Sequence, residues 1–210
     1  MTDILEPFDH AFPCTEFPHA LFYEWDNVLR FELGGEDVPT ARPLKRFNQA
    51  IHRAHAVAEV LFLKTEALWL LTSYYGEKPG SKKRLKPLKH CGLEPAKITH
   101  LGAVAQNDTD YIAEFGRDQF RFWDAIQLTE KSQLQEVLWL TLGAELGIRP
   151  RLTTDVYFVD FEQNLVLHPY DDRGMDVTAV TKEALRPIFH NFGPWILEWN
   201  RPEIQAHFET

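Results

Sequence analysis

Charged and polar side chains gather near the C-terminal end of the chain, between two apolar stretches. They are His168, Tyr170, Asp171, Asp172, Arg173 and Asp176. Carboxylates grouped in this way are typical ligands of a divalent cation such as Mg²⁺, and a bound cation can activate water for hydrolysis. One interpretation is therefore a metal-dependent hydrolase that uses Asp171, Asp172 and Asp176 with His168 beside them.

The same segment has a simpler interpretation as a tight turn. Aspartate bonds its own downstream amides in turns, and we expect Gly174 to supply a positive φ. Arg173 can form an ion pair with an acid at the end of a strand. Because a turn with one salt bridge uses all these residue types without a substrate, we assign no catalytic residue and no metal ligand here. We predict instead that these six side chains face a protein partner.

Other residues with metal-binding or nucleophilic side chains lack the partners that such chemistry needs. His52 and His55 lie one turn apart on an expected helix, but no carboxylate or third histidine is placed beside them as a ligand set requires. Cys14 and Cys91 have no second cysteine at metal-ligand spacing, so both are expected to be reduced thiols. Phosphate loops, nucleophile elbows and dinucleotide fingerprints are missing as well. We therefore predict no cofactor.

Strands on both sides must hold the polar segment in place. Side chains alternate in character over residues 155–161 and 165–170, and a third short strand is expected over 175–180. Turn-forming residues separate these runs, which predicts a three-strand antiparallel meander. A helix is expected after Thr181, and Pro187 should kink or restart it because proline removes a backbone donor.

The upstream sequence alternates between strand and helix patterns. Residues 1–20 show no steady periodicity and predict an irregular arm. A helix beginning at Pro43 is indicated by apolar residues that recur at spacings of three and four, namely Leu44, Phe47, Ile51, Ala54, Ala58 and Leu61. The other expected elements are strands over residues 21–33, 66–75, 98–105 and 120–128, a turn at 107–110, and a helix over 131–146 capped by Gly147.

These elements together predict an α+β protein, with a mixed, largely antiparallel sheet and helices packed on it. We expect one domain over residues 1–210, in which residues 150–210 hold the meander and the C-terminal helix. The apolar tail with Trp195, Ile196, Trp199 and Ile204 is expected to dock on the body.

The charge of the chain narrows the kinds of partner. Acidic residues outnumber basic ones by 31 to 22, which gives a formal net charge of −9. This sign repels phosphate backbones and anionic membranes and favours a cationic partner. The basic stretch over residues 82–89 lacks interleaved aromatics, so we interpret it as a solvated helix or loop and predict no nucleic acid. No apolar run is long enough to span a bilayer, and we expect a cytoplasmic protein without a membrane partner.

Parts of the C-terminal region resemble a known group of proteins. Residues 156–159, 167–177, 185–189 and 195–201 look like a small bacterial family of uncharacterised domains, whose hallmark is the turn Tyr-Asp-Asp-Arg-Gly-apolar-Asp, here residues 170–176. The resemblance is closest over residues 150–210, and the upstream elements are compatible with it. Trp199-Asn200-Arg201 stands where the family has Tyr-Asp-Arg. The resemblance implies a family without an established reaction.

Three functions follow from these observations. The leading hypothesis is a non-enzymatic binding protein, an immunity-type inhibitor that neutralises a cationic toxin by direct contact, because acidic charge speeds encounter and Trp and Tyr form tight interfaces. The alternative is the metal-dependent hydrolase built on Asp171, Asp172 and Asp176. An accessory or scaffolding domain is the second alternative.

Overall fold

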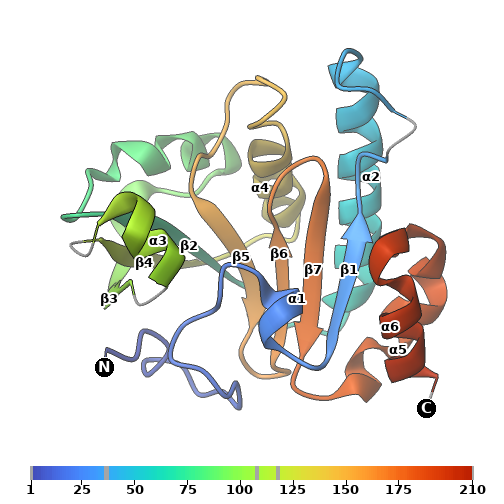
Figure 1. The fold of residues 1–210 in the computed structure, drawn as a ribbon. Helices are drawn as coiled ribbons and strands as arrows, with labels where there is room; N and C mark the ends of the chain where they lie inside the picture. Colours follow the sequence, from blue (N-terminus) through green and yellow to red (C-terminus); the bar gives the residue numbers. More distant parts are fainter. Residues whose placement is uncertain (1, 36–37, 107–108, 117–118, 210) are drawn as a thin grey trace.

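The computed structural model describes residues 2–35, 38–106, 109–116 and 119–209. Its centre is a sheet of seven strands in the order β1-β7-β6-β5-β2-β4-β3, and each neighbouring pair is antiparallel (Figure 1). The strands are β1 Val28–Glu32, β2 Trp69–Gly76, β3 Thr99–Ala105, β4 Phe120–Gln127, β5 Asp155–Asp160, β6 Leu165–Pro169 and β7 Gly174–Ala179. The predicted three-strand meander is therefore confirmed as β5, β6 and β7.

Helical segments connect and flank these strands. The α-helices are α1 Leu21–Glu24, α2 Pro43–Leu61, α3 Thr109–Phe115, α4 Ser132–Leu142, α5 Lys182–Phe192 and α6 Arg201–Phe208. The 3₁₀-helices are η1 Lys82–Cys91, η2 Pro95–Lys97, η3 Gly193–Trp195 and η4 Glu198–Asn200. The predicted α+β class is confirmed, as are the helix from Pro43 and the two strands that became β3 and β4.

Alternation along each strand divides the sheet into two faces with separate cores. In β5, Val156 and Phe158 point to the face that α2, α4 and α5 cover, while Tyr157 and Val159 point to the other face. All four side chains are fully buried. Because successive strand residues point to opposite sides, a strand buried on both faces reads as a continuous apolar run, as residues 156–159 of β5 do.

The N-terminal segment covers the second face of the sheet. Residues 2–20 contain no helix or strand, yet Ile4, Leu5 and Phe17 are fully buried. Phe17 packs on Trp123 and Tyr157, with ring centroids 6.4 and 5.7 Å apart. Figure 1 shows this blue segment on one side of the sheet and α2 and α4 on the other. The segment thus serves as the third layer of the fold.

The strand predicted over residues 21–33 is wrong in its first half. Residues Leu21–Glu24 form the single turn α1, and β1 begins at Val28. Tertiary contacts override the β-propensity of this aromatic run. The Phe22 amide donates to the Asp176 carboxylate at 3.1 Å, and the Arg30 guanidinium lies 4.7 Å from the centre of the Phe22 ring.

The helix predicted over residues 131–146 is too long. Helix α4 ends at Leu142, and Gly143 rather than Gly147 is its C-cap. The chain folds back there, so that the Ile148 amide donates to the Gly143 carbonyl at 3.0 Å. A Cβ on Gly143 would meet the Ile148 Cβ at 3.1 Å, so a glycine at this position permits the early stop.

The helix does not restart at Pro187, because α5 runs without interruption from Lys182 to Phe192. Pro187 is exposed. The Glu183 carbonyl, which loses its amide donor to the proline, can therefore bond to water instead.

Three smaller expectations need correction. The turn expected at residues 107–110 lies partly outside the described residues, and Thr109 begins α3. Leu44 is 69% exposed and does not belong to the buried face of α2. In the C-terminal tail, Ile196 and Ile204 are buried as expected, but Trp199 is 88% exposed. Within the described ranges, no helix combines the length and the apolar character needed to cross a membrane.

The fully buried Phe158 gives a test of the core. Phe158→Ala should lower the free energy of unfolding by about 3–5 kcal/mol, because it removes a large side chain and leaves a cavity. Leu44→Ala, at an exposed position of α2, should change it by less than about 0.5 kcal/mol. Urea unfolding followed by circular dichroism measures both. Equal effects of the two substitutions would contradict the assignment of the core.

Candidate functional site

Asp171 organises the turn between β6 and β7. Its Oδ1 atom accepts a hydrogen bond from the Arg173 amide at 2.7 Å, and its Oδ2 atom accepts from the Arg173 Nε at 2.8 Å. The predicted turn chemistry and its salt bridge are therefore present. The Arg173 side chain is 78% exposed, so this ion pair is weak in water.

Asp172 faces in a different direction and joins the turn to α2. Its carboxylate is paired with the Arg46 guanidinium, and both side chains are nearly buried. The same guanidinium donates to the carbonyls of Gly35 and Val38 at 2.9 and 2.8 Å. Arg46 thus holds the connection between β1 and α2 against the turn.

Asp176 has no exposed side-chain surface and is held by β1. Arg30 donates to its two oxygens from Nε and Nη2 at 2.9 and 3.1 Å, and the Tyr170 hydroxyl donates to the same carboxylate. Burial, followed by the charge of Asp176, raises the pKa of Tyr170 well above its usual range, which keeps the phenol protonated as a donor. The Phe22 amide completes the set of donors.

The three carboxylates therefore have three different arginine partners and do not converge. Among the described residues, no group of three or more His, Cys, Asp or Glu side chains is arranged to hold a metal ion. The geometry gives the hydrolase interpretation no support. Of the six predicted site residues, Tyr170 and Asp176 contact each other. Asp171 instead contacts Arg173, and Asp172 contacts Arg46.

Gly174 is required for a different reason from the one predicted. It is not among the glycines with a positive φ. A Cβ at this position would lie 3.0 Å from both the Phe31 carbonyl oxygen and the Tyr170 ring. The glycine therefore lets β1 and the tyrosine approach the turn closely.

His168 is buried and packed between rings. It stacks on Tyr157 with centroids 4.0 Å apart, and its Nδ1 atom lies 2.7 Å from the Val156 carbonyl oxygen. Burial lowers the pKa of His168 to about 4, so the imidazole is neutral near pH 7. A neutral, enclosed imidazole holding a carbonyl is a structural group in this fold.

A second buried polar cluster, which the sequence did not predict, lies under the N-terminal segment. Arg121 is 4% exposed and donates to Ser73 Oγ at 3.0 Å, to the Tyr157 hydroxyl at 2.6 Å and to Asp155 at 3.3 Å. Burial alone would raise the pKa of the Asp155 carboxyl, but His19 and Arg121 hold it well below its usual range. The pair therefore remains ionised although it is largely enclosed.

This cluster also binds the backbone of the N-terminal segment. Arg121 donates to the Phe17 carbonyl at 2.5 Å, and the Tyr157 hydroxyl donates to the Pro18 carbonyl at 3.1 Å. The His168 Nε2 atom lies 3.2 Å from the next carbonyl oxygen, that of His19. Two successive carbonyls are thus held by side chains from β4 and β5, and the third lies beside the His168 ring of β6, whose single N–H is directed at Val156. A signal was present, since Arg121 is a charged residue between the aromatic residues Phe120 and Phe122 of β4.

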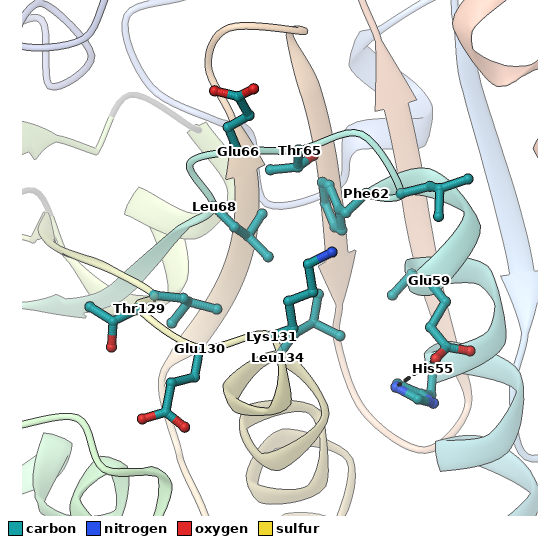
Figure 2. Close-up of a pocket in the computed structure, with 13 residues that line it drawn as sticks. His55, Glu59, Phe62, Thr65, Glu66, Leu68, Thr129, Glu130, Lys131 and Leu134 are labelled. Atoms are coloured by element: carbon teal, nitrogen blue, oxygen red, sulfur yellow. Dashed lines mark ion pairs between the residues drawn. The ribbon is translucent and has the colours of Figure 1, made fainter.

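An open pocket lies elsewhere, between the C-terminal end of α2 and the start of α4 (Figure 2). Its volume is about 400 Å³, within the range of ligand and side-chain pockets. The floor is apolar and comes from the C-terminal end of α2, from the segments just before β2 and just after β4, and from α4; it consists of Ala58, Phe62, Leu68, Leu128 and Leu134. Leu63, beside this floor, is 70% exposed.

The rim of this pocket is mainly acidic. Glu59, Glu66 and Glu130 are all exposed there. Glu59 lies 3.7 Å from His55, whereas Glu66 and Glu130 form no ion pair within the described residues. In Figure 2 the carboxylates of Glu66 and Glu130 point away from the floor, and the Lys131 side chain reaches over it toward Phe62. The flexible lysine stem thereby shields part of the apolar surface.

Burial predicts how the three aspartates differ in importance. Asp176→Asn and Asp172→Asn should each cost about 3–5 kcal/mol of stability, because each leaves a largely buried arginine without its counter-charge. Asp171→Asn should cost less than about 1 kcal/mol, since Arg173 is solvated and asparagine still forms the turn. Chemical denaturation measures all three. Equal costs would show that the turn does not depend on its buried partners.

The depressed pKa of His168 predicts a loss of stability in acid. The unfolded chain takes up a proton near pH 6.5, which the folded protein accepts only near pH 4. Stability from this group is therefore full above pH 6.5 and falls as the pH falls toward 4. Between pH 7.5 and 5 we expect Tm to drop by about 2–4 °C for each 1 kcal/mol lost.

His168→Gln should flatten this Tm profile, because glutamine does not titrate. His90→Gln, at an exposed position, is the matched control and should leave the profile unchanged. If Tm of His168→Gln still falls with pH as steeply as that of wild type, another titrating group causes the loss of stability in acid.

Comparison with known proteins agrees with the bacterial family of uncharacterised domains that the sequence resembles. The chain is 21% identical over 210 residues to the uncharacterized protein YnaE of Bacillus subtilis (strain 168), across 91% of this chain and 95% of that protein. No solved structure matches this chain. A family model matches residues 4–200, a range that includes the N-terminal segment, all seven strands and the turn. The chain therefore belongs to the family described as a domain of unknown function, DUF3885.

Proposed function

We propose that this protein is a non-enzymatic binding protein that holds a cationic protein partner, in the manner of an immunity-type inhibitor of a toxin. The observation that carries the proposal is the pocket of Figure 2, which combines an apolar floor with three exposed glutamates. Such a pocket suits one apolar anchor side chain of a partner with lysine or arginine on either side of it.

The floor supplies the affinity in this arrangement. An aromatic or aliphatic side chain that becomes fully buried contributes about 1.5–3 kcal/mol. Leu63 is already 70% exposed, so covering it removes further apolar surface from water. The Lys131 stem covers part of this floor. A partner side chain that enters the pocket displaces the stem and covers the floor in its place.

The glutamates supply selectivity for a cationic partner and raise the rate of association with it. Glu66 and Glu130 are solvated and have no ion-pair partner among the described residues, so a cation can approach them without breaking an existing contact. Charges at the rim of an interface mainly raise the association rate and disfavour partners of the same sign. The net charge of −9 acts in the same direction over a longer range.

The turn over residues 170–176 enters this proposal as a support for the sheet. Asp172 and Asp176 are occupied by Arg46 and Arg30, and His168 is enclosed. Arg173 keeps a largely exposed side chain but is paired with Asp171. We place the encounter with the toxin in the cytoplasm.

Charge reversal at the rim tests the proposal. The protein is co-expressed with the product of each gene adjacent to its own, and cell survival and co-purification are recorded. Wild type should rescue cells from one of these products and form a complex with it. Glu66→Lys with Glu130→Lys should weaken that complex by about tenfold or more, because two attractive contacts become repulsive.

Glu203→Lys with Glu209→Lys is the matched control. Both residues are exposed and lie at α6, so the variant has the same net charge without touching the pocket. It should bind within about twofold of wild type, apart from a small steering effect. Equal losses of affinity in both variants would show that the pocket does not contact the partner. Failure of every adjacent gene product to bind would overturn the immunity-type function.

A further inference from the structure

The basic segment η1 places its side chains with a period of three. Leu85, Leu88 and Cys91 are buried, whereas Lys83, Lys86 and Lys89 are exposed. A 3₁₀-helix has three residues per turn, so residues three apart lie directly above one another. The three lysines therefore form one column on the outside of η1, and the apolar residues form another against the core.

This lysine column, defined as Lys83, Lys86 and Lys89, borders a hollow. The opposite wall is the segment from Gly92 to Ala96, and the volume between them is about 670 Å³. Lys82 also lines the hollow but is engaged, because its Nζ atom donates to the Ile98 carbonyl at 2.8 Å. The side chains of these three lysines form no hydrogen bond or ion pair in the part of the chain that the structure describes.

An unpaired column of like charges is unfavourable in the isolated protein. Lysines one turn apart repel each other, because their charges have the same sign. Arg84, within the same segment, is a further positive charge. It is turned inward to the buried Asp124. The wall of the hollow adds one acid, Glu94. A chain with a net charge of −9 thus concentrates unpaired positive charge on one side of η1.

We propose that the lysine column binds an extended acidic peptide segment of a protein partner, with acidic side chains at every second position. Successive lysines are about 6 Å apart along the axis, from a rise of about 2.0 Å per residue. Alternate side chains of an extended peptide are about 6.6 Å apart, from a rise of about 3.3 Å. Each carboxylate can therefore meet one ammonium without distortion of either chain.

The other wall of the hollow favours a peptide over a nucleic acid. Pro95 and Ala96 offer aliphatic surface to the side chains between the acids. Base recognition in single strands depends on aromatic side chains for stacking. The described residues that line the hollow include no aromatic residue. The acidic charge of the whole chain also disfavours a long polyanion, which extends beyond the column.

This site is separate from the acidic pocket proposed above. The two share no lining residue and have opposite charge. A partner that presents a basic surface and an acidic tail could meet both, but neither contact requires the other.

The test uses a fluorescein-labelled peptide of about ten residues in which Glu and Thr alternate. Fluorescence anisotropy at about 0.05 M and 0.15 M salt gives the affinity and its salt dependence. Wild type should bind the peptide, and the triple variant Lys83→Gln, Lys86→Gln, Lys89→Gln should bind at least about tenfold more weakly. The melting temperature of the triple variant should be no lower than that of wild type, because the three side chains are solvated and their removal relieves repulsion.

The triple variant Lys45→Gln, Lys64→Gln, Lys78→Gln is the matched control. These lysines are exposed elsewhere on the chain, and the change in net charge is the same. The control should bind like wild type, and a peptide with its glutamates in one block should bind more weakly than the alternating one. Equal losses in both variants, or tighter binding of a single-stranded oligonucleotide than of the peptide, would overturn the proposal. Loss of toxin rescue in the rim variant leaves this result unaffected.

Discussion

Arg30 on β1 and Asp176 on β7 lie directly opposite each other in the antiparallel register, on the sheet face that the N-terminal segment covers. Neither charge can be enclosed alone, because an unpaired buried ion costs more than an imperfect pair. The pair therefore fixes an early strand beside the last strand of the meander, although the two partners are 146 positions apart in the sequence. The Phe22 amide and the Tyr170 hydroxyl satisfy the remaining carboxylate positions, so α1 and the turn acquire their places from the same contact. The sheet edge, the first helix and the polar turn all depend on this ion pair.

The same constraint applies on the other side of the meander, where Arg121 and Asp155 are enclosed with Tyr157. There the guanidinium donates to the Phe17 carbonyl of the N-terminal segment, and the Tyr157 hydroxyl donates to the next carbonyl, that of Pro18. An irregular segment needs such partners, since its carbonyls have none within a helix or sheet. Apolar residues such as Ile4 and Phe17 then fill the spaces between the polar contacts. A segment without periodicity can consequently be as well buried as a helix.

Much of the fold could be predicted from the sequence because it depends on local periodicity. Alternation identified β5, β6 and β7, and spacings of three and four identified α2. The errors occur where a distant residue decides the local structure. Residues 21–24 form a helical turn because Asp176 accepts the Phe22 amide, and α4 stops at Leu142 because Ile148 folds back on Gly143. The candidate site was harder still. Aspartates 171, 172 and 176 are neighbours in sequence, but their roles are set by Arg173, Arg46 and Arg30, and a single sequence does not reveal the last two pairings. The pocket joins α2 to α4 through residues that are unremarkable one by one.

Arginine and lysine divide two tasks in this chain. The ion pairs of the described residues involve Arg30, Arg46, Arg84, Arg121, Arg173 and Arg201 or a histidine, and none involves a lysine. The planar guanidinium can donate to a carboxylate and to backbone carbonyls at once, as Arg46 and Arg121 do, and it loses little entropy for each bond. Lysine is a strongly hydrated point charge on a flexible stem, so it remains at the surface. Arginine therefore forms the ion pairs inside the fold, whereas lysine and glutamate remain at the surface, where a partner can contact them. The acidic rim at Glu66 and Glu130 and the lysine column of η1 can change in sign or spacing without disturbing the Arg30–Asp176 pair, so one scaffold can carry different binding surfaces.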